Sequence, residues 1–100
     1  MLLLIAQRIK ACCSEAMTLC RWGGDEFMVI MPKSTVETAM ALAERIRQAV
    51  LDIPPVGDFK VTLSLGVVQR LDHESPTNLM ARADQALYRS KAAGKDRVSQ

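Results

Sequence analysis

Two adjacent glycines between two apolar runs place the strongest constraint on how this chain folds. Gly23 and Gly24 separate residues 17–22 from residues 27–31, and both runs have the length of a short strand. Glycine adopts the positive φ angles of a tight connection at little steric cost, so a β-hairpin is predicted here. The second run is apolar on both faces and ends at Pro32. We therefore expect it to lie inside a sheet.

Amphipathic helices are predicted on both sides of this hairpin. The first covers residues 2–13, with an apolar stripe made up of Leu2, Ile5, Ile9 and Cys12. The second is expected to begin with a capping box in which Ser34 is the N-cap and Glu37 lies three residues further on. Its apolar face is predicted to comprise Val36, Met40, Ala43, Ile46 and Val50.

The second half of the chain predicts one strand and one helix. Apolar and polar residues alternate over residues 59–67, which is typical of a strand. Ser75 and Pro76 then open a helix, as N-cap and first helical residue, and Gly94 ends it. Its buried face is expected to comprise Leu79, Ala83, Ala86 and Leu87. A short closing strand around residues 97–98 is possible, so the predicted order is αββαβα(β).

This order predicts an α/β or α+β sandwich, and 100 residues suffice for one domain, residues 1–100. The net charge of +2 and the 4% of aromatic residues do not favour nucleic-acid binding. No apolar run reaches the roughly 20 residues of a membrane span, so we expect a soluble, cytoplasmic protein. The cysteines Cys12, Cys13 and Cys20 are expected to be reduced, buried thiols rather than zinc ligands.

The predicted hairpin carries two adjacent carboxylates at its tip, Asp25 and Glu26. Residues without side chains beside two acids suit a phosphate ester held together with a hard cation, because carboxylate oxygens prefer Mg²⁺ or Mn²⁺. The alternative is an ordinary solvated turn, since glycine and aspartate are frequent turn residues. Spacing alone does not separate these two interpretations.

The wider sequence resembles the GGDEF family, the bacterial diguanylate cyclases. The resemblance begins with the family signature itself, Arg21-Trp22-Gly23-Gly24-Asp25-Glu26-Phe27. It continues through a strand motif, a helix motif and the segment that follows the helix: Val61-Thr62-Leu63-Ser64-Leu65-Gly66-Val67, Ala83-Asp84-Gln85-Ala86-Leu87-Tyr88-Arg89-Ser90-Lys91 and Gly94-Lys95-Asp96-Arg97-Val98. Four motifs in the family's order are far more specific than one short match.

The resemblance implies a nucleotide-cyclase or ferredoxin-like palm fold and the condensation of two GTP molecules into cyclic di-GMP, with release of two pyrophosphates. It implies that each domain holds one GTP and that two domains act as a homodimer. Gly23 and Gly24 would approach the nucleotide, and Asp25 would ligate Mg²⁺ or Mn²⁺ with Glu26 completing the acidic tip. The resemblance assigns the terminal phosphates to Lys91 and Lys95.

Smaller expectations concern the neighbours of these residues. Trp22 is interpreted as a packing residue, and Arg21 is expected to support the site by pairing with an acidic neighbour. Lys91 and Lys95 are four residues apart and share one side of the helix if its last turn continues. Asp96 replaces the family's usual asparagine and would place an unfavourable anion near the triphosphate.

The sequence also departs from the family. Family domains begin with an Asp-x-Asp-x-Phe-Lys strand that supplies a further metal ligand, and no segment here matches it, so we expect upstream sequence and an inactive isolated chain. A sheet edge left open in this way would favour pairing with another chain. Ser14-Glu15-Ala16-Met17 lacks the Arg-x-x-Asp pattern of the product-inhibition site, so no inhibitory site is expected. The alternatives are a non-catalytic GTP-binding or dimerisation module and, behind it, a purely structural sandwich with an acidic turn.

Overall fold

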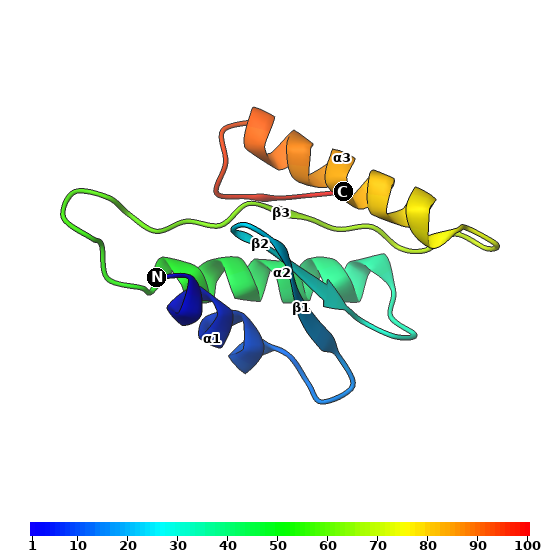
Figure 1. Cartoon of the computed structure of the whole chain (residues 1–100), viewed down its shortest axis with the longest axis horizontal. Coiled ribbons are helices and arrows are strands. Elements are labelled where there is room, and N and C mark those ends of the chain that lie inside the picture. The colour runs from blue at the N-terminus through cyan, green and yellow to red at the C-terminus, as the bar shows by residue number, and fades with distance from the viewer.

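The chain alternates helices with short strands, and the computed structural model describes all of residues 1–100. The elements are α1 (Leu2–Cys12), β1 (Thr18–Gly23), β2 (Glu26–Ile30), α2 (Val36–Leu51), β3 (Leu65–Gly66), α3 (Pro76–Ala92) and β4 (Val98–Ser99) (Figure 1). This order confirms the predicted α+β class and includes the closing strand.

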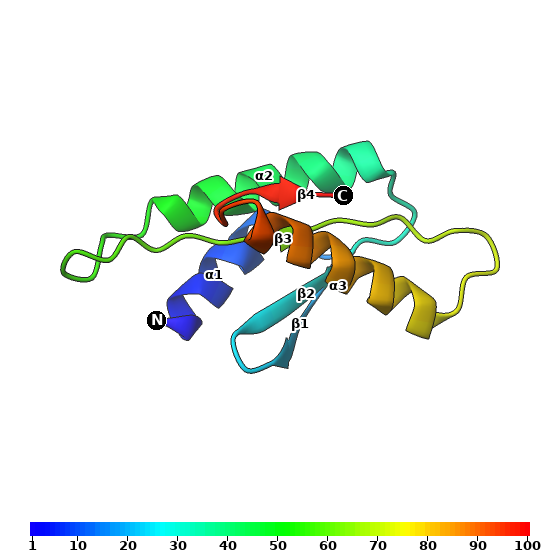
Figure 2. The same cartoon turned by 90° about the horizontal axis from the view of Figure 1, so that it is seen from above.

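Three helices and two small sheets are arranged around the segment that contains β3. That segment runs between α2 and α3 in both views (Figures 1 and 2). The hairpin of β1 and β2 is antiparallel, whereas β3 pairs with β4 in parallel. No helix combines the length and apolar character that a bilayer span requires.

The core is thin and centres on α2. Only nine of the 100 residues are buried, and the other apolar side chains are partly or fully exposed. The buried residues are Ile9, Leu42, Ala43, Ile46, Val50, Ile53, Val67, Ala86 and Ser90. Ile9 of α1 packs with Leu42 and Ile46 of α2. The helical stripes predicted for α1 and α2 therefore meet each other. The three cysteines are unpaired but only half buried, which corrects the expectation of buried thiols.

Strand β2 does not lie inside a sheet, which corrects the expectation drawn from its apolar residues. Its one partner is β1, and the two strands form a separate two-stranded sheet. Ile30 is 48% exposed at its end. An apolar strand is an interior strand only when other strands flank it on both sides, and this chain places none on the second edge of β2.

The alternating segment of residues 59–67 is a strand only at Leu65 and Gly66, so its predicted length is wrong. Alternation shows which face a residue would present, but the strand itself needs hydrogen-bonded partners. The partners in this chain are limited to β4, which is two residues long. Phe59 lies 79% exposed, beyond the paired part, and forms an isolated bridge with Val56.

Helix α2 begins one residue later than predicted. Its N-cap is Thr35, whose hydroxyl accepts a hydrogen bond from Thr38 N at 3.2 Å. Ser34 Oγ donates instead to Pro32 O at 3.2 Å. Ser and Thr are both favoured N-caps, so the sequence signal was correct in kind but shifted by one position. For α3, the predicted cap Ser75 is confirmed by its hydrogen bond from Asn78 N.

Helix α3 lies directly against β3 at Gly66. A Cβ atom on this glycine would be 2.3 Å from Leu87 N and 2.9 Å from Ala83 O, so backbone meets backbone here. Beside this contact the buried Ser90 donates its hydroxyl to Leu65 O at 2.7 Å and lies 2.8 Å from Ser99 Oγ. One serine therefore joins α3 to both strands of the parallel pair.

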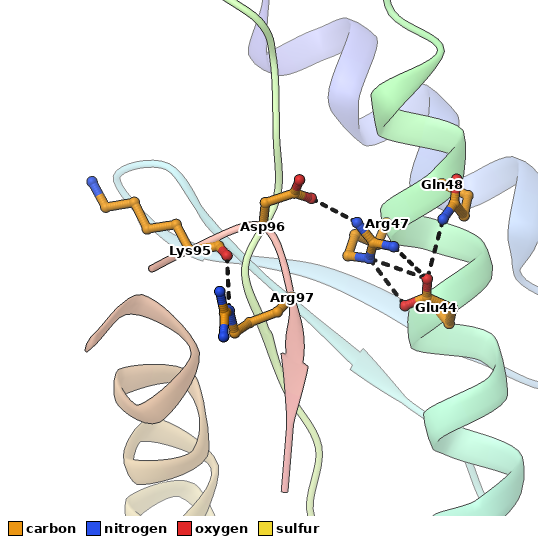
Figure 3. Close-up of polar contacts among 6 residues, drawn as sticks. All are labelled: Glu44, Arg47, Gln48, Lys95, Asp96 and Arg97. Atoms are coloured by element: carbon orange, nitrogen blue, oxygen red, sulfur yellow. Dashed lines mark hydrogen bonds and ion pairs between the residues drawn. The ribbon is translucent and has the colours of Figure 1, made fainter. Parts of the chain in front are cut away.

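A polar network joins α2 to the loop before β4 (Figure 3). Arg47 Nη1 donates to Asp96 Oδ1 at 2.8 Å, and Arg47 Nε donates to Glu44 Oε2 at 3.0 Å. Hydrogen bonds from Arg47 and Gln48 lower the pKa of Glu44 from 4.5 to about 2. The same network raises the pKa of Arg47, with the Glu44 hydrogen bond as the largest cause and the Asp96 hydrogen bond second.

We predict that Gly66→Ala destabilises the protein by about 3 kcal/mol, because the added methyl group would displace the α3 backbone. The measurement is the free energy of unfolding in urea. Ser64→Ala is the matched control, since Ser64 is half buried on the same segment and its side chain makes no hydrogen bond. Equal stability of Gly66→Ala and wild type would contradict the close approach of α3 to β3.

We predict that Glu44→Gln makes stability less sensitive to acid. The folded-state pKa of Glu44 lies below its unfolded value, so its contribution is present above about pH 4.5 and is lost as the pH falls toward 2. Unfolding free energies measured across this range should fall less steeply for Glu44→Gln than for wild type. Glu15→Gln, at an exposed turn residue without a partner, should keep the wild-type slope.

Candidate functional site

The hairpin predicted at the two glycines is confirmed: Gly23 ends β1 opposite Glu26, and Gly24 and Asp25 form the turn between the strands. Gly23 has φ +142° and Gly24 has φ +50°, conformations that L side chains rarely adopt. No other atom lies within 4 Å of a Cβ built on either glycine, so the space beside the turn is open. The glycines thus permit the turn and leave its backbone accessible to a ligand.

Trp22 lies in an irregularity of the hairpin rather than in the core. Arg21 pairs with Phe27 and Gly23 pairs with Glu26, so Trp22 is the extra residue of a β-bulge. Its side chain is 55% exposed, which corrects its interpretation as a packing residue. A bulge increases the local twist of a hairpin, so Trp22 helps to aim the tip.

Arg21 supports the turn through the main chain instead of an acidic neighbour. Its Nε donates to Gly24 O at 2.9 Å, and its Nη2 donates to the same carbonyl. The expected supporting role therefore has a different partner from the predicted one. Because the guanidinium binds the turn carbonyl twice, it holds the tip in one conformation and leaves the two adjacent carboxylates unpaired with it.

The two acids at the tip have different surroundings. Asp25 is exposed and its carboxylate makes no hydrogen bond or ion pair in the structure. Glu26 is half buried, and its Oε1 lies 3.9 Å from Lys91 Nζ. The structure thus brings the predicted hairpin acids and one of the two predicted phosphate-binding lysines to the same place, although they are 65 residues apart in sequence.

The Glu26–Lys91 pair is weak enough to be rearranged by a ligand. Both side chains are close to half exposed, at 42% and 48%, and 3.9 Å exceeds hydrogen-bond length. Exposed ion pairs of this kind contribute at most about 1 kcal/mol. Lys91 can therefore turn toward an anionic ligand at small cost, while Asp25 remains free for a cation.

Lys95 does not share a helical side with Lys91, which corrects the expectation based on their spacing. Helix α3 ends at Ala92, and a Schellman motif follows in which Lys95 N donates to Ser90 O at 2.9 Å and Gly94 N donates to Lys91 O at 3.3 Å. Lys95 itself has φ +65° and belongs to the loop. Its ammonium group makes no ion pair or hydrogen bond there.

Asp96 forms an ion pair with Arg47 of α2. The 2.8 Å ion pair directs its carboxylate toward α2, and Lys95 extends on the other side of the loop (Figure 3). The expectation that Asp96 disfavours a bound triphosphate stays a prediction, because Arg47 is shared with Glu44 and the three groups together keep one negative charge. The i, i+3 spacing of Glu44 and Arg47 was visible in the sequence, but the pairing of Arg47 with Asp96 joins residues 49 positions apart and carried no local signal.

The chain supplies few ligands for a metal ion. No group of three or more His, Cys, Asp or Glu side chains could hold one. Mg²⁺ in nucleotide sites is bound by one or two carboxylates together with phosphate oxygens and waters. The unpaired Asp25 fits one such ligand, and Glu26 offers a second only if it leaves Lys91. The donors present therefore fit a metal ion that is shared with a bound phosphate group.

The site residues lie on an open surface. A hollow of about 540 Å³ between α3 and the segment after β3 is lined by Arg70, Arg82 and Arg89, but none of the predicted site residues lines it. A second hollow of about 570 Å³ lies along the exposed face of α2 and also excludes them. Neither of these two hollows therefore encloses the hairpin tip.

Comparison with known proteins identifies this arrangement. The family model "Diguanylate cyclase, GGDEF domain" matches residues 1–97. The chain is 37% identical over 94 residues to diguanylate cyclase DgcM of Escherichia coli and 42% identical over 99 residues to diguanylate cyclase A of Treponema denticola. These matches cover 94% and 95% of this chain, but the chain spans only 23% and 27% of the length of these two relatives.

Solved structures show the same fold. The GGDEF domain of DgcB from Caulobacter crescentus, in complex with c-di-GMP, superposes with a TM-score of 0.88 at 30% identity and covers 96% of this chain and 60% of that one. Diguanylate cyclase SiaD of Pseudomonas aeruginosa, in complex with its activator SiaC, also gives 0.88, at 32% identity over 97% of this chain and 38% of that one. The chain belongs to the GGDEF family of diguanylate cyclase domains.

Proposed function

We propose that residues 1–100 are the C-terminal part of one GGDEF domain in a longer parent protein that condenses two GTP molecules into cyclic di-GMP. The observation that carries this proposal is the approach of Lys91 on α3 to Glu26 of the hairpin, next to the unpaired Asp25. A carboxylate can bind a cation and an ammonium group can bind a phosphate. The two groups lie side by side at an open glycine turn, which suits a metal-bound nucleoside triphosphate. The match to the DgcB GGDEF domain covers 96% of this chain but 60% of that one, which supports the proposal that residues 1–100 are only part of a GGDEF domain.

In the proposed reaction the 3′-hydroxyl of one GTP attacks the α-phosphorus of the other. A phosphodiester bond forms, the bond from the α-phosphorus to the bridging oxygen breaks, and pyrophosphate leaves with the electron pair. The attacking hydroxyl loses its proton to solvent or to a nearby base. Two such steps close the ring and release two pyrophosphates.

Each residue of the tip has a role that its surroundings support. Asp25, unpaired and exposed, is proposed as the Mg²⁺ or Mn²⁺ ligand, and Glu26 completes the acidic tip. Gly23 and Gly24 let the nucleotide lie against the backbone. Lys91 and Lys95 are proposed to bind the terminal phosphates, since both ammonium groups are accessible. When bound, the metal ion would neutralise charge that develops on the leaving pyrophosphate.

Two copies of the site are needed, because each hairpin tip presents one set of these residues and the product joins two nucleotides. An open surface that covers a ligand on one side suits an arrangement in which the second side is supplied by another domain. We therefore propose a homodimer in which two GGDEF domains face each other through their hairpin tips, with one GTP on each.

A second candidate is a non-catalytic GTP-binding or dimerisation module. The open second edge of β2 and the short pairing of β3 favour it, because unpaired strand edges bind other strands. The unpaired Asp25 favours the enzyme instead, since a dimerisation surface does not require a free carboxylate at a glycine turn. Turnover by the parent protein separates the two candidates.

We predict that Asp25→Asn in the parent protein lowers cyclic di-GMP formation by about 100-fold or more, because the amide is a poor ligand for Mg²⁺. Chromatography of the nucleotide product at saturating Mg²⁺ measures the effect. Asp58→Asn is the control, at an exposed carboxylate outside the site. Wild-type turnover by Asp25→Asn would overturn the assignment of the metal ligand.

We predict that the 100-residue chain alone forms no cyclic di-GMP from GTP and Mg²⁺. Its hairpin offers one unpaired carboxylate, Asp25, and we propose that the metal–triphosphate unit needs a further carboxylate from the rest of the parent domain. Chromatography of the nucleotide product and an assay of released pyrophosphate measure the activity, with the parent protein as the positive control. Product formed at the rate of the parent would contradict the need for ligands outside these residues.

We also expect no product inhibition through residues 14–17 of the parent.

A further inference from the structure

The loop between α3 and β4 holds Lys95 in an uncommon conformation. Gly94, Lys95 and Asp96 have φ angles of +121°, +65° and +48°. Positive φ is rare for residues other than glycine, and such residues persist only where surrounding contacts fix them. Two consecutive non-glycine residues of this kind therefore need an explanation in the contacts of the loop.

Three contacts hold the loop, and together they engage both of its sides. Lys95 N donates to Ser90 O at 2.9 Å, which ties it to the end of α3. Arg97 Nε donates to Lys95 O at 3.0 Å. Asp96 accepts from Arg47 at 2.8 Å, and this is the contact that ties the loop to a different element, α2.

Arg47 is itself held firmly. Its side chain is 17% exposed, and its Nε and Nη2 both donate to Glu44, one helical turn earlier. The fork of the guanidinium leaves Nη1 for Asp96, so one planar group bridges two carboxylates. A lysine has a single ammonium group and cannot reproduce this bridge, because it lacks the fixed fork geometry.

The direction of Lys95 follows from this bridge. Asp96 points toward α2, and the neighbouring Lys95 side chain leaves the loop on the opposite side (Figure 3). Because the two residues are adjacent, the hold of Arg47 on the Asp96 carboxylate also restrains the backbone from which the Lys95 side chain projects. Loss of the bridge would release the loop from α2.

We propose that Arg47 is a positioning residue for the nucleotide site: by holding Asp96, it fixes Lys95 in the direction from which its ammonium group binds the phosphates of GTP. This inference rests on the proposed function, in which Lys95 is a phosphate ligand. Arg47 lies on α2 and acts only through the loop; it touches no nucleotide.

The test is a double-mutant cycle on nucleotide binding by the parent protein. The probe is a GTP analogue with a methylene group between the α- and β-phosphorus, so that the bond broken in turnover stays intact. Arg47→Met and Lys95→Met should each raise the Kd by about tenfold. The double variant should bind no more weakly than Lys95→Met alone, because Arg47 then has no ammonium group left to position.

A merely structural role of Arg47 predicts the opposite result. Arg47→Met would then weaken binding by the same factor in both backgrounds, and this outcome would overturn the proposal, as would an unchanged Kd for Arg47→Met alone. Arg45→Met is the matched control, since Arg45 lies on the same helix, is exposed and makes no ion pair; its Kd should equal that of wild type. Thermal unfolding of each variant checks that it is folded.

Variants of Asp96 keep the proposal testable if Arg47→Met does not fold. Asparagine still offers an oxygen to Arg47, whereas alanine does not, so Asp96→Asn should weaken binding less than Asp96→Ala. Equal losses for the two variants would count against the bridge. If Lys95→Met leaves the Kd of the analogue unchanged while Asp25→Asn raises it strongly, this inference is overturned and the proposed function stands. If the wild-type protein does not bind the analogue, both are overturned.

Discussion

The arrangement of the molecule depends on the contact of α3 with β3 at Gly66. A side chain at this position would lie 2.3 Å from the helix backbone, so only glycine allows the helix to rest directly on the strand. Ser90 then joins the helix to both strands of the parallel pair. This packing decides where the C-terminal end of α3 lies, and Lys91 near that end lies 3.9 Å from Glu26 of the hairpin.

The site combines a fixed frame with side chains that are free to bind. Arg21 holds the glycine turn through Gly24 O, and Arg47 holds the loop after α3 through Asp96. Both arginine side chains are hydrogen-bonded to oxygen atoms of the protein itself. The unpaired Asp25 and Lys95 and the loosely paired Lys91 remain for a ligand. Such a division is expected of a site for a metal-bound phosphate, in which the frame must be ordered before the ligand arrives.

Local patterns predicted the elements well where the cause was local. The hairpin at Gly23 and Gly24, the helix start at Ser75 and the helix stop at Gly94 were all visible, because turns and caps are made by residues close in sequence. Predictions failed where the cause was distant. The apolar run of β2 and the alternation of residues 59–67 indicated longer sheets, but strand pairing depends on neighbours that this chain places on one edge only.

The amino-acid sequence was enough to predict the family, the order of elements and the acids and lysines that we propose for the site, because these follow from motif order and short-range spacing. Two further points depend on tertiary packing: that Glu26 meets Lys91 and that Asp96 faces Arg47. These contacts join residues 65 and 49 positions apart in the chain. Contacts over such distances are set by how helices pack on strands, and no periodicity along the chain encodes them.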